Sequence, residues 1–232
     1  NGTLDGSSLV RLVTAVAEIK AQGYPCVMVS SGAVGAGVSS LNLTAYPDDV
    51  ETRQAAAAIG QARLMQRYQT VFEQFDLDVA QLLLTGADLE ENRDRISATM
   101  HRLLEEGDII PIVNENDSVA IEELRVGDND MLSARVSRLL EARLLVMLST
   151  VDGLQDDDGG VMTEVRNIDA VAQHVRSDHG KFSIGGMASK LEAVKFALDA
   201  GVETVIASGR EPSALKEIIS GGDGGTRFPL KV

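Results

Sequence analysis

The chain has 232 residues and a mass of 24.7 kDa, which is enough to bury a real core within one large domain. Its formal net charge of −14 argues against a nucleic-acid partner, because such partners usually need a basic surface. No apolar run approaches the ~18 residues of a membrane span, and the single cysteine, Cys26, cannot form an internal disulfide. We therefore expect a cytoplasmic protein without a membrane segment, in which Cys26 is a small core residue.

The hydrophobic pattern alternates between helical and strand periods along the chain. Apolar residues spaced three and four apart, from Leu9 to Ile19, predict a first helix that Gly23 ends. Short apolar runs predict buried strands at residues 26–29, 79–84, 109–113, 144–148 and 202–207. Further helices are expected at residues 55–75, from about 96 to 107, at 131–141 and at 187–200. This alternation predicts an α/β fold, with a mostly parallel sheet covered by helices on both faces, in a single domain spanning residues 1–232.

In such sheets ligands bind beyond the carboxyl ends of the strands, so the loops at those ends form the candidate site. The first loop, S-S-G-A-V-G-A-G at residues 30–37, follows the strand at 26–29. Its small residues let the backbone approach a ligand, although a tight glycine turn would explain them equally well. The glycine spacing is G-x-x-G-x-G, which does not match the dinucleotide-binding fingerprint G-x-G-x-x-G.

Two strongly polar segments come next. N-E-N-D-S at residues 114–118 follows the strand at 109–113, and G-D-N-D at 127–130 opens a helix. The first could be a solvated turn and the second a helix cap. Alternatively, their amides and carboxylates suit the amino and carboxylate groups of a small substrate, and their carboxylates could position lysines or Mg²⁺.

Two more candidate segments lie at the end of a predicted strand and at the start of a predicted helix. S-T-V-D-G-L at residues 149–154 follows a strand and is, by itself, a strand-end turn. G-G-M-A-S-K at 185–190 leads into a helix, so the Lys190 ammonium and the helix N-terminus could both face one phosphate. The alternative is an ordinary surface lysine. The sequence has no Walker A motif, no G-x-S-x-G motif and no ligand-like spacing among His101, His174 and His179.

Taken in order, these segments resemble the glutamate 5-kinases of the amino acid kinase family. The matching stretches are S-S-G-A-V (30–34), A-A-A-A-I-G-Q-A-R-L-M-Q (55–66), L-L-L-T-G-A-D-L-E (82–90), P-I-V-N-E-N-D-S-V-A (111–120), V-G-D-N-D-M-L-S-A (126–134), G-G-M-A-S-K-L-E-A (185–193), A-S-G-R-E-P (207–212) and G-T-R-F (225–228). The resemblance runs from about Leu4 to Phe228, and the pair of N-E-N-D and G-D-N-D is specific to these enzymes. It implies a three-layer α/β/α sandwich with a mainly parallel, eight-stranded central sheet.

The resemblance also implies roles for individual residues. Glutamate should be held by Ser31, Asp117 and Asn129, with Asn114, Asn116 and the backbone of Gly32 nearby. The nucleotide should contact Ser149, Thr150, Ile184, Gly185, Gly186, Met187, Ala188, Ser189 and Lys190. Lys190 should also neutralise charge on the transferring phosphoryl group, and Asp130 should organise the lysines. Thr150 stands where the family usually has aspartate, and Ser183 where it usually has glycine.

The reaction so implied is transfer of the γ-phosphate of ATP, with Mg²⁺, to the γ-carboxylate of L-glutamate, the first step of proline biosynthesis. A carboxylate is already nucleophilic at neutral pH, so this reaction needs no general base. The resemblance further implies feedback inhibition by proline, a homo-oligomer (dimer or tetramer), a strand with a Lys-x-Gly-Ser loop ahead of Asn1, and no RNA-binding-like domain after Val232. The alternatives are another carboxylate or carbamate kinase of the same fold and a non-catalytic amino-acid sensor.

Overall fold

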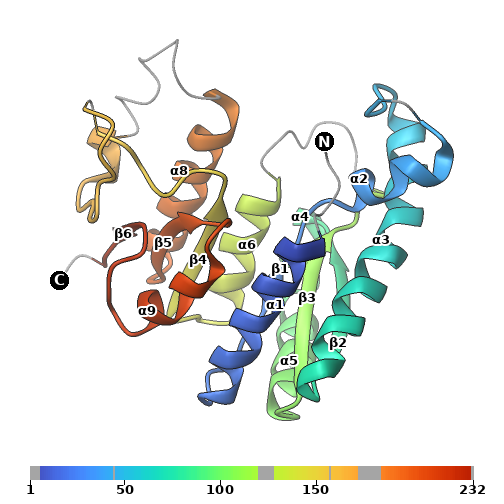
Figure 1. Cartoon of the computed structure of the whole chain (residues 1–232), viewed down its shortest axis with the longest axis horizontal. Helices are drawn as coiled ribbons and strands as arrows, with labels where there is room; N and C mark the ends of the chain where they lie inside the picture. Colours follow the sequence, from blue (N-terminus) through green and yellow to red (C-terminus); the bar gives the residue numbers. More distant parts are fainter. Residues whose placement is uncertain (1–5, 44, 120–127, 157, 172–183, 231–232) are drawn as a thin grey trace. The chain divides into compact units, whose positions relative to one another are not determined.

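The computed structural model of the protein describes residues 6–43, 45–119, 128–156, 158–171 and 184–230 (Figure 1). The chain divides into two compact units, which we call unit 1 (Asn1–Leu124) and unit 2 (Arg125–Val232). Each unit is an α/β structure with its own sheet and its own hydrophobic core. None of the described helices has the length and hydrophobicity that crossing a membrane would require.

Unit 1 is built on a parallel sheet of three strands. Both β1 (Met28–Val29) and β2 (Asp78–Leu84) pair in parallel with the central strand, β3 (Ile109–Glu115). Val29 lies opposite Val113, and Leu84 lies opposite Glu115, so the carboxyl ends of the three strands meet at one edge. The helices of unit 1 are α1 (Gly6–Ala21), α2 (Ala33–Val38), η1 (Ser39–Leu41), α3 (Val50–Phe72), η2 (Glu73–Phe75), α4 (Gly86–Glu91) and α5 (Arg93–Glu105).

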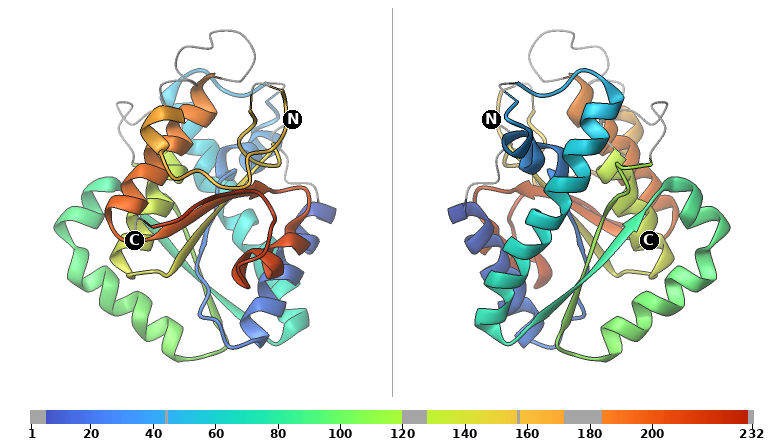
Figure 2. Two further views of the ribbon diagram at one scale, coloured as in Figure 1. Left: turned by 90° about the vertical axis from the view of Figure 1, so that its left-hand side faces the viewer. Right: turned by 90° about the vertical axis from the view of Figure 1, so that its right-hand side faces the viewer.

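The helices of unit 1 cover its sheet on both faces. On one face α1 and α3 pack against β3, and this core contains the fully buried Val13, Phe72 and Ile112. Figure 2 shows α5 on the opposite face, where Met100 is completely buried. Cys26 packs at the margin of the first core, and burial raises the pKa of its thiol, as expected for the core residue that the sequence predicts.

Unit 2 has a mixed sheet of three strands. The central β5 (Glu203–Ser208) pairs in parallel with β4 (Leu144–Ser149) and antiparallel with β6 (Thr226–Phe228). The helices of unit 2 are α6 (Asp128–Leu139), α8 (Ile184–Asp199), η3 (Pro212–Ala214) and α9 (Leu215–Ile219). The two long helices lie side by side (Figure 1).

Side chains of β5 alternate between two cores, because successive residues of a strand point to opposite faces. Ile206 belongs to the core under α6 and α8, which also contains Val194. Its neighbours Val205 and Ala207 instead contact Ile218 of α9. Unit 2 therefore has helices on both faces of its sheet, as the alternating sequence pattern predicts.

The structure confirms an α/β fold with mainly parallel strands, but it does not confirm a single eight-stranded sheet. The described residues form six strands in two three-stranded sheets. Several boundaries also differ from the predicted ones. The strand expected at 26–29 is reduced to Met28–Val29, and the helix expected at 55–75 is α3 at 50–72, because Asp49 caps its start by accepting from the Thr52 amide at 2.8 Å.

Candidate active site

The serine loop of unit 1 joins β1 to α2 and is fixed at its start by two hydrogen bonds. The Ser30 amide donates to the Val113 carbonyl at 2.8 Å, which extends the pairing of β1 with β3 by one residue. The Ser30 hydroxyl lies 3.0 Å from the Tyr68 hydroxyl of α3, in a buried contact. Burial raises the pKa of the Tyr68 phenol, so this group stays a neutral hydrogen-bonding partner.

The next residues of this loop face outward. Ser31 and Gly32 are both exposed, and Gly32 has a φ of +97°, in the left-handed region that favours glycine. The turn at Gly32 directs the chain into α2, whose first residue, Ala33, is almost fully buried. Ser31, a predicted substrate-binding residue, is thus presented to solvent on a loop whose two ends are anchored.

Helices α2 and α3 approach so closely that glycine is required at both contact positions. A Cβ atom at Gly60 would lie 1.8 Å from the Ala33 carbonyl oxygen, and one at Gly37 would lie 1.8 Å from the Ala56 carbonyl oxygen. Real Cβ atoms essentially never come within 3.0 Å of a nonbonded heavy atom from another part of the chain. These glycines therefore fix the position of α2, and with it the end of the serine loop, against α3.

The second polar segment of unit 1 follows β3, and its first residue is buried. Asn114 is 1% exposed; its amide nitrogen donates to the Gln61 side-chain oxygen at 2.9 Å, and its side-chain oxygen accepts from the Glu115 amide at 2.9 Å. The Asn116 amide donates to the Leu84 carbonyl at 3.1 Å, which ties the turn to β2. Asn116 and Asp117 are half-buried, so they remain closer to solvent than Asn114.

Within unit 1 the structure therefore brings two predicted loops to neighbouring strand ends. It also reveals two residues that the sequence analysis did not select, Gln61 and Tyr68, each of which holds one of these loops from α3. Both occupy the buried, mostly apolar stripe of α3, which also includes Leu64 and Phe72. The sequence signal for the first of them is a glutamine at an apolar-stripe position of the helix; it marks Gln61 as unusual but does not show what it contacts.

In unit 2 the predicted Lys190 and Asp130 form a bidentate ion pair. The Lys190 ammonium donates to both carboxylate oxygens of Asp130, at 2.7 and 2.9 Å, and the two side chains are 16% and 21% exposed. Asp130 lies in the first turn of α6 and Lys190 in the second turn of α8. The pairing confirms that these two residues, 60 positions apart in the sequence, meet.

Asn129 precedes Asp130 in the first turn of α6. Its side-chain oxygen is buried, and no donor among the described residues reaches it. The Ser133 hydroxyl donates to the Asp130 carbonyl at 2.6 Å, one turn further along the helix. Ser133 thereby adds a hydrogen bond at the start of α6, next to the ion pair.

The remaining predicted residues of unit 2 lie at a strand end and at the start of α8. Ser149 ends β4 opposite Ser208 of β5, and the Gly209 amide donates to the Ser149 carbonyl at 2.7 Å, so the two strands stay joined up to Thr150, which is exposed. Helix α8 begins at Ile184 and Gly185, continues through Gly186, Met187, Ala188 and Ser189, and reaches Lys190. Ser183 lies outside the described residues.

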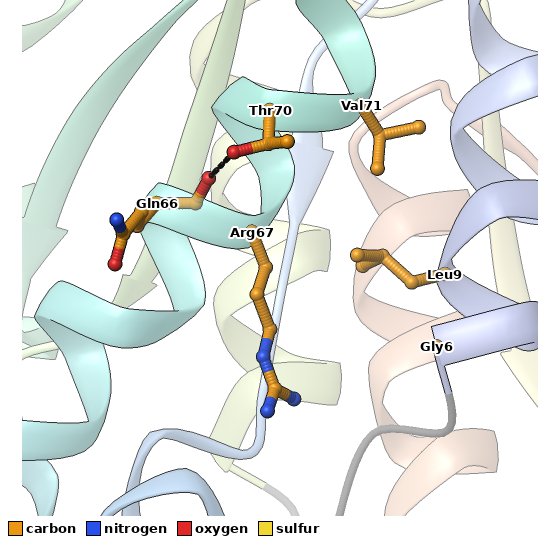
Figure 3. Close-up of a pocket in the computed structure, with 6 residues that line it drawn as sticks. All are labelled: Gly6, Leu9, Gln66, Arg67, Thr70 and Val71. Carbon is orange, nitrogen blue, oxygen red and sulfur yellow. Dashed lines mark hydrogen bonds between the residues drawn. The ribbon is translucent and has the colours of Figure 1, made fainter.

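Figure 3 shows a pocket of about 430 Å³ between α1 and α3, where Leu9 and Val71 face one another. None of the predicted site residues lines it; its lining is Gly6, Leu9, Gln66, Arg67, Thr70 and Val71. Within the described ranges, no three His, Cys, Asp or Glu side chains are grouped to hold a metal ion. His101 bonds to its own helix through Ser97, and the other two histidines fall outside those ranges.

Comparison with known proteins places the chain in a family. The model of the amino acid kinase family matches residues 3–208, so the chain belongs to this family. The matched region crosses the boundary at Leu124 and covers unit 1 from residue 3 onward and unit 2 as far as residue 208.

Within this family, the chain is similar over nearly its whole length to several proteins named glutamate 5-kinase. The chain is 39% identical to a glutamate 5-kinase of Clostridium acetobutylicum over 98% of this chain and 88% of that protein. It is 42% identical to a glutamate 5-kinase of Symbiobacterium thermophilum over 98% of this chain and 89% of that protein. A glutamate 5-kinase of Synechococcus elongatus is 43% identical over 96% of this chain, but this match spans only 63% of the relative.

Solved structures of low sequence identity share the fold. A carbamate kinase from Giardia lamblia bound to AMP-PNP has a TM-score of 0.68 at 15% identity, over 100% of this chain and 93% of that one. An N-acetylglutamate synthase from Neisseria gonorrhoeae, complexed with coenzyme A and N-acetyl-glutamate, has a TM-score of 0.72 at 16% identity, over 98% of this chain and 57% of that one.

Proposed function

We propose that this protein transfers the γ-phosphate of ATP to the γ-carboxylate of L-glutamate, giving L-glutamyl 5-phosphate, the first step of proline biosynthesis. The relatives named glutamate 5-kinase, at about 40% identity over nearly the whole chain, support this assignment. The structural observation that carries it is the bidentate Lys190–Asp130 pair, because it holds a cation at the start of α6, on the last residue of the G-D-N-D sequence.

Unit 1 supplies substrate-binding groups in this proposal. Ser31 and Asp117 offer a hydroxyl and a carboxylate to the α-carboxylate and α-ammonium groups of glutamate, and both lie on loops anchored to neighbouring strand ends. The Gly32 amide and Asn116 add further polar groups in the same loops. In unit 2 we assign Asn129 to glutamate binding on the resemblance to glutamate 5-kinases. Its buried side-chain oxygen, which no described donor reaches, is a ready hydrogen-bond acceptor.

Unit 2 supplies the groups that act on the nucleotide. The first turn of α8, from Ile184 to Met187, offers backbone N–H groups to phosphate oxygens, and Ala188 and Ser189 continue the same proposed nucleotide-binding segment. Ser149 and Thr150 offer hydroxyls at the end of β4. A γ-carboxylate oxygen of glutamate forms the new bond to the γ-phosphorus, the bond to the β–γ bridging oxygen breaks, and ADP leaves. No proton has to be removed from the carboxylate, so catalysis depends on positioning and on charge neutralisation by Lys190.

Magnesium is proposed as part of the ATP complex. Mg²⁺ prefers oxygen ligands and is commonly bound through one or two carboxylates together with substrate phosphates. Asp130 is the carboxylate that lies next to the proposed phosphate-binding helix, but it is already engaged by Lys190. The described residues therefore suit a metal that arrives on the phosphates of ATP better than one held by the protein.

The remaining features of the whole protein are also proposals. The family match continues across both units, which supports one amino acid kinase domain with the family's three-layer, eight-stranded architecture. We further propose a cytoplasmic homo-oligomer that binds no nucleic acid and is inhibited by proline, and the net charge of −14 supports the absence of a nucleic-acid partner.

The test is formation of γ-glutamyl hydroxamate from glutamate, ATP, Mg²⁺ and hydroxylamine. We expect product with glutamate and much less with aspartate or carbamate; equal rates with these acceptors would support a different carboxylate or carbamate kinase. Calorimetric binding of glutamate without any ADP release would instead support an amino-acid sensor.

A further inference from the structure

A buried polar pair links α3 to the segment that follows β3. Gln61 and Asn114 are 6% and 1% exposed, and the Asn114 amide nitrogen donates to the Gln61 side-chain oxygen at 2.9 Å. Gln61 belongs to the buried stripe of α3, which includes Ala57, one turn before it, and Leu64, one turn after it. A buried polar group without a hydrogen-bond partner costs free energy, so this pair strongly favours the one arrangement in which its hydrogen bond is made.

Both polar atoms of the Asn114 side chain make a hydrogen bond within unit 1. Its nitrogen donates to the Gln61 side-chain oxygen, and its oxygen accepts from the Glu115 amide, both at 2.9 Å. These two bonds fix the rotamer of Asn114 and the direction of the chain as it leaves β3. Further along this turn, Asn116 and Asp117 are half-buried and so remain closer to solvent than Asn114.

The same turn of α3 also holds the serine loop. Gly60, the neighbour of Gln61, lies against the Ala33 carbonyl so closely that a Cβ atom would be 1.8 Å from it. Two turns later, Tyr68 contacts Ser30 at the other end of that loop. Helix α3 therefore touches both candidate substrate loops of unit 1, and Gln61 makes its polar contact with the second one.

We propose that Gln61 is a positioning residue for amino-acid binding, which acts through Asn114 on the turn at residues 114–117. In this proposal Asn114 orients the turn through its buried side chain and does not itself contact the substrate. The Gln61 amide nitrogen is buried and has no acceptor among the described residues, so the oxygen of this side chain is the atom that carries the role. The inference rests on the proposed glutamate site.

The experiment compares steady-state kinetics of Gln61→Met and Gln61→Glu with those of the unaltered full chain. Gln61→Met keeps the length but removes the acceptor, so we expect the KM for glutamate to rise about 10- to 100-fold, the range set by one unsatisfied buried donor. The KM for ATP and the kcat should change less than about threefold, since a displaced turn weakens substrate binding. Gln61→Glu keeps a side-chain oxygen at the same distance from the backbone, so it should raise the KM for glutamate much less than Gln61→Met does.

A double-mutant cycle separates action through Asn114 from a general packing effect. In an Asn114→Ala background, Gln61→Met should change the KM for glutamate less than about twofold, because the contact it removes is already gone. Gln66→Met on the same helix is the matched control, since Gln66 is exposed, and it should leave all constants unchanged. If Gln61→Met does not fold, Gln61→Asn, which is one methylene too short to reach Asn114, replaces it.

Three results would overturn the inference. They are an unchanged KM for glutamate in Gln61→Met, equal effects of Gln61→Met and Gln61→Glu, and additive effects in the double mutant. The unaltered protein is assayed first, so a failure of the proposed glutamate kinase activity itself would appear before any variant is compared.

Discussion

Replacing Lys190 by alanine tests the proposed catalytic role most directly. In the structure its ammonium makes two hydrogen bonds to Asp130, at 2.7 and 2.9 Å, and it is only 16% exposed. If it neutralises charge on the transferring phosphoryl group, its contribution is largest in the transition state. We therefore expect kcat to fall roughly 100-fold or more, about 2.7 kcal/mol, while the KM for glutamate changes little.

The same substitution should also lower stability by a moderate amount. Exposed ion pairs contribute about 0–1 kcal/mol, whereas removing one partner of a buried pair costs about 3–5 kcal/mol. Lys190 and Asp130, at 16% and 21% exposure, lie between these limits. We expect a loss of about 1–3 kcal/mol, which for a chain of this size lowers the Tm by roughly 2–12 °C. The loss of activity must therefore be measured well below that temperature.

A matched control is available on the same helix. Lys195 pairs with Asp169, but the two side chains are 53% and 62% exposed. Lys195→Ala should change kcat less than about twofold and the free energy of unfolding by about 0–1 kcal/mol. The assay is hydroxamate formation at saturating ATP, with glutamate varied. A Lys190→Ala variant that raises only the KM for glutamate and keeps kcat would refute the assigned role.

Four further outcomes are expected. Asp117→Ala should raise the KM for glutamate and leave kcat nearly unchanged; a lower kcat at unchanged KM would contradict substrate binding by this side chain. Proline should inhibit in competition with glutamate in initial-rate assays, and inhibition that glutamate does not relieve would indicate a separate site. Gly60→Ala should lower the free energy of unfolding in urea by about 3 kcal/mol or more, because its new Cβ would meet the Ala33 carbonyl at 1.8 Å. Tyr68→Phe should cost about 1 kcal/mol in the same assay, the value of one hydrogen bond, because it removes the contact with Ser30; no change would show that this contact does not hold the serine loop.

Hydrophobic periodicity predicted the elements of the fold well, because burial decides it locally. The runs at 109–113 and 144–148 fall within β3 and β4, and the strand expected at 202–207 is β5, shifted by one residue. Helix starts that depend on capping residues were predicted less well. The helix predicted at about 96–107 is α5, which starts earlier, at Arg93, directly after Asn92. Helix α4, which the hydrophobic pattern did not predict, precedes Asn92 and starts with a capping box in which Thr85 and Asp88 bond to each other's backbone.

The candidate site was predictable where it rests on loop sequences. Asp130 was expected to organise the lysines, and in the structure its carboxylate contacts Lys190, while the catalytic roles of the two residues stay predictions. What the sequence could not show is how a long helix reaches the loops. Gln61 and Tyr68 belong to an apolar stripe by spacing, so periodicity counts them as core, and only the packing reveals that their polar ends meet Asn114 and Ser30.

This arrangement of α3 has a consequence for how variants of unit 1 should behave. Leu64 and Phe72 are completely buried and purely apolar, so trimming them creates cavities and reduces stability through lost packing. Gln61 lies on the same stripe, yet its contact ends at a loop that carries proposed substrate groups. Substitutions on one helix face should thus separate into two classes, one that lowers the free energy of unfolding with little effect on KM and one that raises KM with a smaller effect on stability. Because the two kinds of residue alternate along α3, the substrate loops are held by the same surface that forms the core, and their geometry is set as unit 1 folds.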